Sequence, residues 1–236
     1  MPAPPTGSEL RIKIGGEAGF GIKAAGQTLA RSFVALGLEV FDLTEYPSLI
    51  RGGHNTYTLR VSPTPISSHV EAVDVLIALN RETIDLHLGE LVDGGAVIYD
   101  PEDKENAEWQ APDGVLPVPI PLMRLAKDAG GPIMRNTVAL GAVLALVGLP
   151  VDPLADGLRA QFAHKAPEIA EQNVLAATAG HENATEAAAR FGVKLQAVPD
   201  APRRLLVDGN EAIGLGALAA GIGFYAAYPM TPASSV

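Results

Sequence analysis

Cysteine is absent from this chain, and aromatic residues are scarce. None of the 236 residues is cysteine, one is tryptophan, and aromatic residues make up 5%. Without cysteine, this chain has no disulfide framework, no thiolate metal site and no cysteine-ligated iron–sulfur cluster of its own. The few aromatic rings, set among abundant Ala, Gly, Val and Leu, favour closely stacked helices and parallel strands.

The chain also has fewer basic than acidic residues and no long apolar run. The chain has 17 Lys and Arg against 27 Asp and Glu, a formal net charge of −10. This balance argues against nucleic acid or an anionic membrane surface as the main partner. No stretch approaches the roughly 18 apolar residues that span a bilayer, and the first eleven residues lack the pattern of a signal peptide. We therefore expect a soluble cytoplasmic protein.

Strand and helix patterns alternate along most of the sequence. A strand over 10–14 runs into Gly15-Gly16, a helix follows over 22–36, and a strand over 38–43 completes a βαβ unit. Further strands, the last at an edge, are predicted at 56–61, 73–79, 95–99 and 115–120. Further helices are predicted at 81–91, 122–127, 136–147, 153–162, 166–179 and 185–191. The alternation predicts an α/β fold with an open, mostly parallel sheet flanked by helices.

Composition divides the chain into four parts. Residues 1–8 form a flexible Pro- and Gly-rich lead, 9–195 the α/β domain, and 196–208 a linker. Residues 209–236 read as a helix over 211–220, a short strand over 223–228 and a Pro-marked turn. Such a strand is stable only with parallel neighbours. We therefore expect the chain to be a piece of a longer polypeptide, or to complete its second domain with a partner.

The first candidate site is the glycine-rich segment from Gly15 to Gly21. Gly16, Gly19 and Gly21 lie between a strand and a helix, spaced GxxGxG rather than GxGxxG, and no Lys-Ser or Lys-Thr pair follows. Two interpretations stay open. The glycines permit only a tight turn, or they bring backbone N–H groups close to an anionic ligand or a neighbouring active site. Asp42 lies roughly where an acidic ribose ligand would.

The second candidate site is the polar loop Arg51-Gly52-Gly53-His54-Asn55. A guanidinium beside two glycines suits a carboxylate or phosphate. His54 and Asn55 either hydrogen-bond a ligand or organise the turn. The remaining histidines have no metal-ligand spacing, so no metal site is predicted from them: His69, His87, His164 and His181.

Four segments together resemble one enzyme family. Three of them are similar to the γ domain of 2-oxoacid:ferredoxin oxidoreductases: GGEAGFGIKAAGQTLA, YPSLIRGGHNTYTLRVS and MRNTVALGAVLALVGLP. The fourth is similar to the start of the α domain, which binds the pyrimidine side of thiamine diphosphate: GNEAIGLGALAAGIGFYAAYPMTPASSV. The γ-then-α order resembles the α subunit of two-subunit members, many of which act on 2-oxoglutarate.

The resemblance implies a reaction and a set of partners. It implies CoA-dependent oxidative decarboxylation of a 2-oxoacid to an acyl-CoA, with thiamine diphosphate, Mg²⁺ and ferredoxin as electron acceptor. It also implies an (αβ)2 hetero-oligomer whose β subunit carries the iron–sulfur cluster, in agreement with the absence of cysteine here. The α-domain glutamate that engages the aminopyrimidine would lie beyond Val236, so we expect this chain alone to be inactive.

The resemblance also assigns residues. The YPxTP motif of the family maps onto Tyr228, Pro229, Thr231 and Pro232. It implies that Thr231 is catalytic and holds the substrate carboxylate, with Tyr228 and Pro229 also binding substrate. The γ domain covers the cleft on the CoA side, which implies a CoA or cleft role for Gly16, Gly19, Gly21, Arg51, Gly52, Gly53, His54 and Asn55. Phe20 departs from the family, where many relatives have Gln.

Two other functions fit the residues. One is a stand-alone γ-like module that binds a nucleotide or CoA, or docks onto partners, without catalysis. The other is an NAD-linked Rossmann enzyme, which the glycine spacing opposes.

Overall fold

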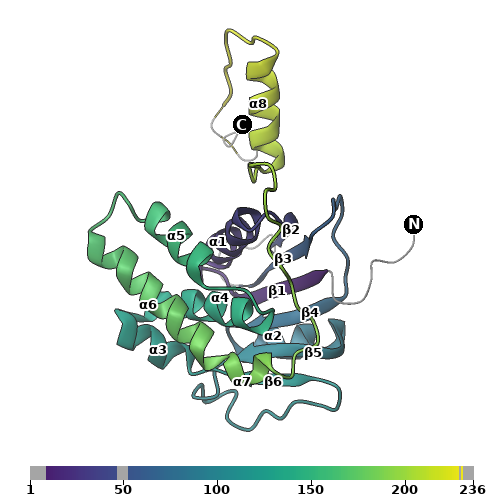
Figure 1. The fold of residues 1–236 in the computed structure, drawn as a ribbon, viewed down its shortest axis with the longest axis vertical. Helices are drawn as coiled ribbons and strands as arrows, with labels where there is room; N and C mark the ends of the chain where they lie inside the picture. Colours follow the sequence, from purple (N-terminus) through teal and green to yellow (C-terminus); the bar gives the residue numbers. More distant parts are fainter. Residues whose placement is uncertain (1–8, 47–52, 229, 231–236) are drawn as a thin grey trace. The chain divides into compact units, whose positions relative to one another are not determined.

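A computed structural model of the chain describes residues 9–46, 53–228 and 230. The chain divides into two compact units, Met1–Pro202 and Arg203–Val236. The first unit is built on a six-stranded sheet with helices on both faces (Figure 1). Its strands are β1 (Leu10–Glu17), β2 (Glu39–Glu45), β3 (His54–Ser62), β4 (Val73–Ala78), β5 (Leu91–Tyr99) and β6 (Leu116–Pro119).

The strand order is β2-β3-β1-β4-β5-β6. The pairs β1–β4, β4–β5 and β5–β6 are parallel, whereas β3 runs antiparallel to both of its neighbours. The prediction of an open, mostly parallel α/β sheet is therefore confirmed, with β6 at an edge as expected. The predicted βαβ unit differs in one respect, since β3 lies between β1 and β2. The short connection 46–53 allows only an antiparallel return, because a parallel crossover needs a dozen or more residues.

One face of the sheet is covered by most of the helices. These are α1 (Ile22–Ala35), α3 (Leu122–Ala129), α4 (Arg135–Leu146), α5 (Asp152–Gln161), α6 (Pro167–Asn183) and α7 (Thr185–Ala188) (Figure 1). Helix α4 is buried from Thr137 to Leu146, which explains why its sequence is apolar on all sides. Ile12 and Ile14 of β1 point to this face and are fully buried. The main core therefore lies between the sheet and α1 and α4.

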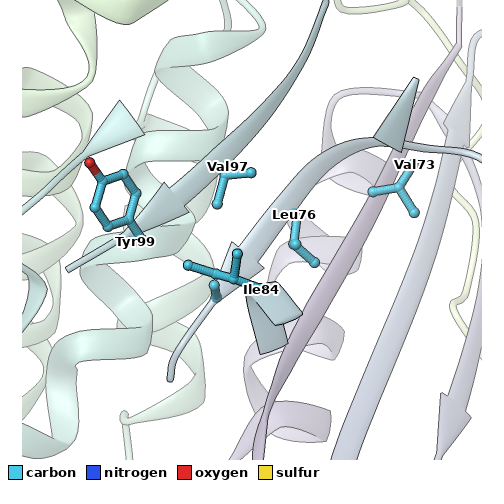
Figure 2. Close-up of a cluster of buried hydrophobic side chains, with 6 residues drawn as sticks. Val73, Leu76, Ile84, Val97 and Tyr99 are labelled. Carbon is cyan, nitrogen blue, oxygen red and sulfur yellow. The ribbon is translucent and has the colours of Figure 1, made fainter. Parts of the chain in front are cut away.

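The opposite face carries α2 (Arg81–His87), the 3₁₀ turn η1 (Leu88–Glu90) and a smaller core. In Figure 2, Leu76 and Val97 extend from neighbouring strands toward Ile84 of α2. The rings of Tyr99 and Trp109 pack edge to face, with centroids 4.7 Å apart. Because side chains alternate along a strand, the residues between them face the main core instead. The sheet is thus buried on both sides near β4 and β5.

Several predicted boundaries are wrong, and each has a physical cause. Strand β1 continues through Gly15 and Gly16, where glycine is needed because a Cβ on Gly15 would lie within 3.0 Å of Thr83 in α2. The polar loop predicted over 51–55 ends early, since His54 and Asn55 already belong to β3. Helix α6 runs past Gly180 rather than stopping there, because that glycine serves helix packing.

The second unit contains α8 (Gly209–Ala219), close to the predicted helix, with a capping box between Asp208 and Glu211. The predicted strand at 223–228 is absent, since residues 222–228 have no regular secondary structure. A strand needs hydrogen-bonding neighbours, and the described residues of this unit include no other strand. No residue of α8 is buried. None of the helices in the described ranges combines the length and apolar character needed to cross a membrane.

The predicted linker 196–208 contains neither helix nor strand, and it turns at Pro199 and Asp200, where Asp200 has a φ of 58°. Its first part is attached to the first unit, because the amide of Val198 donates to the carbonyl of Leu36 over 2.8 Å. The division between the two units falls after Pro202.

Candidate functional site

The antiparallel pairing of β1 and β3 brings the two glycine-rich motifs together. Gly16 is paired with Asn55 and Glu17 with His54. Just beyond this pairing, the amide of Ala18 donates a hydrogen bond to the carbonyl of Gly53 over 3.0 Å. The predicted site residues Gly16, Gly19, Gly21, Gly53, His54 and Asn55 are therefore near neighbours. Arg51 and Gly52 lie outside the described residues.

The glycine turn, residues 18–21, connects β1 to α1. The amide of Phe20 donates to the carbonyl of Glu17 over 3.1 Å, which closes the turn. Gly19 and Gly21 have φ angles of 96° and 74°, in the region that residues with a side chain rarely adopt. A Cβ on Gly19 would meet nothing within 4 Å, so backbone conformation and not space requires glycine there.

Helix α1 begins without a side-chain cap. Its N-cap residue is Gly21, no hydrogen bond from a side chain caps it, and its first turn contains no acidic residue. The first intrahelical bond runs from the amide of Ala25 to the carbonyl of Gly21. The N–H groups of Ile22, Lys23 and Ala24 therefore have no partner within the helix. Together with the helix dipole and the charge of Lys23, they favour an anion at this end.

A pocket of about 300 Å³ opens at this helix end, and we call it the polar pocket because charged, hydroxyl and amide side chains are among those that line it. Its walls come from the glycine turn, the first turn of α1, Thr44 at the end of β2, and Asn55 and Thr56 at the start of β3. Glu17 is the acidic group on its wall and Lys23 the basic one. The pocket can receive an anionic group that accepts hydrogen bonds from the amides of α1, with the Asn55 amide beside it.

A second hollow, of about 520 Å³, lies against the same glycine turn and is lined mainly by apolar side chains of α1, α4, α5 and α6. Asn136 of α4 lines this hollow and bonds the backbone of the glycine turn. Its Nδ2 donates to the carbonyl of Phe20 over 2.6 Å, while its Oδ1 is buried without a hydrogen-bond partner among the described residues. Asn136 lies inside α4 and is not its cap. The glycine turn thus separates a polar pocket from an apolar one.

Arg135 fixes the other side of the turn. Its guanidinium lies over the ring of Phe20, 4.0 Å from the centroid. Burial lowers the pKa of Arg135, while Asp103 and Asp100 partly offset this effect. The segment Arg135-Asn136 therefore holds Phe20 by its ring and by its carbonyl. Sequence reasoning used this segment for the family resemblance but assigned neither residue to the site.

His54 lies on the α2 side of the sheet, away from the polar pocket. Its Nε2 is 2.9 Å from Nε2 of His87, and His87 Nδ1 is 2.7 Å from Oε1 of Glu90. Glu90 in turn is paired with Lys13 of β1. Burial, followed by the neighbouring His87, lowers the pKa of His54. His87 was missed from the sequence, because no local pattern places the end of α2 beside the start of β3.

The predicted substrate residues fall in the second unit. Tyr228 is 79% exposed, while Pro229, Thr231 and Pro232 lie outside the described residues. No group of three or more His, Asp or Glu side chains in the described ranges could hold a metal ion.

Asp42 accepts a 2.5 Å hydrogen bond from the Tyr57 hydroxyl, so its carboxylate has a structural partner. Because Asp42 bonds Tyr57, this contact argues against Asp42 as the ribose ligand of an NAD-linked enzyme.

The fold and the site define an α/β domain whose glycine turn and uncapped helix can receive an anionic ligand. The chain belongs to the pyruvate ferredoxin/flavodoxin oxidoreductase family, whose model matches residues 11–183. The resemblance found in the sequence is thereby confirmed.

Individual relatives agree with this assignment. The chain is 29% identical to subunit alpha of 2-oxoacid:ferredoxin oxidoreductase 2 from Aeropyrum pernix, over 96% of this chain and 42% of that subunit. It is similar to the structure of 2-oxoglutarate:ferredoxin oxidoreductase from Magnetococcus marinus, with 2-oxoglutarate, coenzyme A and succinyl-CoA bound (TM-score 0.83, 30% identity, 96% of this chain and 40% of that chain).

A separate subunit is also similar. The keto/oxoacid ferredoxin oxidoreductase gamma subunit from Geobacter sulfurreducens matches with a TM-score of 0.65 and 25% identity, over 76% of this chain and 98% of that subunit. The chain therefore spans about two fifths of the alpha subunits that it matches and nearly all of a gamma subunit. Its relatives are subunits of multi-subunit oxidoreductases.

Proposed function

We propose that this chain is a component of a thiamine-diphosphate-dependent 2-oxoacid:ferredoxin oxidoreductase that converts a 2-oxoacid, first of all 2-oxoglutarate, into an acyl-CoA. Residues 9–195 would be the γ domain, 196–208 the linker and 209–236 the opening of the α domain. The family match supports this proposal, as does the similarity to the Magnetococcus structure, which has 2-oxoglutarate, coenzyme A and succinyl-CoA bound.

The observation that carries the proposal is the junction of the glycine turn with the start of β3. CoA contains phosphates, which suit the uncapped end of α1, and a long arm with apolar and amide groups. The polar pocket and the apolar hollow meet at the same turn, so one ligand with both kinds of group could use both. We assign CoA or cleft binding to Gly16, Gly19, Gly21, Arg51, Gly52, Gly53 and Asn55. His54 would contribute only through the start of β3, because its ring contacts His87 on the α2 side of the sheet.

The remaining groups would be held mainly by other protein. Thiamine diphosphate with Mg²⁺ supplies the decarboxylation chemistry when bound in the assembled enzyme. From this chain, Thr231 would hold the substrate carboxylate, with Tyr228 and Pro229 beside it. In the second unit, Ile213 and Phe224 are 61% and 83% exposed, which fits a domain that needs more protein to cover it.

The partners follow from the same proposal. A β subunit would carry the iron–sulfur cluster, since this chain has no cysteine, and ferredoxin would accept the electrons. We propose an (αβ)2 hetero-oligomer in the cytoplasm.

The test is reconstitution of the complete enzyme. This chain, continued by the rest of its α domain, is combined with a cysteine-bearing β subunit, thiamine diphosphate and Mg²⁺. Reduction of ferredoxin or a viologen is then followed with 2-oxoglutarate, pyruvate and branched-chain oxoacids. We expect CoA-dependent reduction, fastest with 2-oxoglutarate. Absence of CoA-dependent reduction with every one of these acids would contradict the proposal.

A second candidate is a stand-alone γ-like module that binds CoA or a nucleotide, or docks onto partners, without catalysis. The Geobacter gamma subunit favours it, because that separate chain is matched over 98% of its length. Intact-mass measurement of the native protein distinguishes the two. A mass near 24.5 kDa favours the module, whereas a mass more than about twice as large, as expected from the matched alpha subunits, favours the enzyme component.

A further inference from the structure

His54 and His87 form a contact whose proton count is restricted. Their Nε2 atoms are 2.9 Å apart, with ring centroids separated by 4.9 Å. A hydrogen bond between two imidazole nitrogens needs one N–H and one lone pair. The two facing nitrogens can therefore share one proton but cannot both be protonated while the contact lasts.

Glu90 determines which atom of His87 is protonated. Oε1 of Glu90 lies 2.7 Å from Nδ1 of His87, and a carboxylate only accepts hydrogen bonds. Nδ1 of His87 therefore carries a proton. In the neutral pair, His54 donates from Nε2 to the lone pair on His87 Nε2. One more proton can be added without loss of the contact, whereas a second would place two N–H groups face to face.

The charged groups around the pair act in opposite directions, because Lys13 disfavours a proton on His54 whereas Glu82 favours one. Lys13 of β1 lies on the other oxygen of Glu90, Glu82 of α2 lies 3.9 Å from Nδ1 of His54, and Glu17 is the register partner of His54 on β1. Burial raises the pKa of Glu90, but hydrogen bonds from Lys13 and His87 outweigh it and lower that pKa overall. Glu90 therefore remains an anionic anchor for His87.

The orientation of His54 bears directly on the glycine turn. The carbonyl of Gly53 accepts the hydrogen bond from Ala18, and Asn55 lines the polar pocket with Gly19. The His54 ring also lies against the backbone of β1, where a Cβ on Gly15 would be 3.1 Å from its Cε1. Displacement of this ring would therefore disturb the start of β3 and its bond to the turn.

We propose that His87, anchored by Glu90, is a positioning residue for His54: it holds the start of β3 against the glycine turn while the histidine pair carries at most one added proton, and releases it when both imidazoles are charged. The consequence for ligand binding rests on the proposed function. The proton coupling and the response of the Ala18 amide do not.

The first experiment is a pH titration of the full chain by NMR, following the imidazole carbons and the Ala18 amide. We expect His54 and His87 to titrate together in two steps more than about one pH unit apart. Ala18 should stay protected from hydrogen exchange through the first step and lose protection in the second. Independent titration of His54 and His87 would overturn the proposal, as would Ala18 protection that persists when both are charged.

Two substitutions of His87 distinguish a pH-dependent positioning role from a purely structural one. His87→Gln keeps one amide group to bond His54 but removes the second titrating ring, so Ala18 should remain protected at acidic pH values where the unmodified chain loses protection. His87→Leu should lose protection at every pH, and the control His69→Gln should behave like the unmodified chain. Identical behaviour of the Gln and Leu variants would overturn the proposal. If both variants fail to fold, the titration of the unmodified chain alone decides.

CoA is then added to the unmodified chain as a separate measurement. Shifts at the glycine turn that weaken in the second protonation step would support both the positioning role and the proposed function. Absence of any CoA effect in this chain and in the complete enzyme would overturn the proposed CoA site, while the coupled titration would still support the role of His87.

Discussion

The amide of Ala18 donates a hydrogen bond to the carbonyl of Gly53, 3.0 Å away, and this bond links the two glycine-rich motifs of the chain. It lies at the end of the β1–β3 pairing, where Glu17 is opposite His54. A change in the turn between β1 and α1 therefore reaches the start of β3, and the reverse also holds. The two motifs therefore form one structural unit.

Gly19→Ala tests the glycine turn. The substitution places a side chain at φ 96°, which costs about 1–3 kcal/mol or forces the turn to change. In the complete enzyme we expect the KM for CoA to rise by about tenfold, since 1.4 kcal/mol corresponds to that factor. Gly89→Ala is the matched control, because its Cβ also meets nothing within 4 Å but its φ is ordinary. Equal KM values in the two variants would contradict the role of the turn.

Gly141→Ala tests the crossing of α4 and α6. A Cβ on Gly141 would lie well inside 3.0 Å of the Ala177 carbonyl, and one on Gly180 would meet the Val138 carbonyl in the same way. Backbone atoms cannot move aside as a side chain can, so we expect a loss of about 2–3 kcal/mol in the free energy of unfolding. Urea denaturation measures this quantity.

The matched control for that variant is Gly157→Ala in α5. Its Cβ would meet nothing within 4 Å. Alanine also has the higher helix propensity, so we expect a gain of about 0.5–1 kcal/mol. Similar stabilities of the two alanine variants would show that the α4–α6 crossing is not as close as described.

Arg135→Met tests the contact with Phe20. Methionine retains much of the apolar packing but removes the cation, so we expect a loss of about 1 kcal/mol in the free energy of unfolding and a weaker affinity for CoA. Arg124→Met removes an exposed arginine that is paired with Glu102 and should leave both quantities nearly unchanged. Isothermal titration calorimetry measures the affinity for CoA, and urea denaturation measures the free energy of unfolding. If the Arg135 variant has the same free energy of unfolding and the same affinity for CoA as the control, the contact between Arg135 and Phe20 contributes to neither.

The stability of the chain should fall as the solution is acidified. The pKa of His54 is lowered in the folded state, mainly by burial, so the unfolded chain binds the extra proton more readily below its ordinary value of about 6.5. The lowered pKa of Glu90 acts in the same direction below about 4.5. Urea denaturation from pH 7 to about pH 3 should show a decrease in two stages. His54→Gln should remove the upper stage, and its persistence in that variant would contradict this assignment.

The sequence predicted the sheet well where strands are apolar and buried. Strand β4 and helix α1 were located within one or two residues, since continuous apolar runs and helical spacing identify such elements directly. The start of β3 was missed because His54 and Asn55 are polar, and their pairing with β1 depends on a distant part of the chain. The strand predicted at 223–228 failed for the opposite reason: its residues suit a strand, but the described residues of its unit provide no neighbouring strand.

The candidate site was predictable in its residue types and only partly in its construction. Positive φ angles at Gly19 and Gly21 agree with a glycine-dependent turn. The roles of Asn136 and His87 were not predictable, because each contacts the site from a helix far along the chain. Such contacts are determined by how helices pack on the sheet, which spacing within one motif does not reveal.

The most direct test of the central claim is the pair of KM values for CoA and 2-oxoglutarate in the complete enzyme carrying Asn55→Ala. Asn55 lines the polar pocket beside the uncapped end of α1. Loss of one hydrogen bond to a charged group corresponds to about 1.5–3 kcal/mol, so we predict that the KM for CoA rises by tenfold or more while the KM for 2-oxoglutarate is unchanged. An unchanged KM for CoA, or an equal rise in both values, would contradict the claim that the junction of the glycine turn and β3 binds CoA.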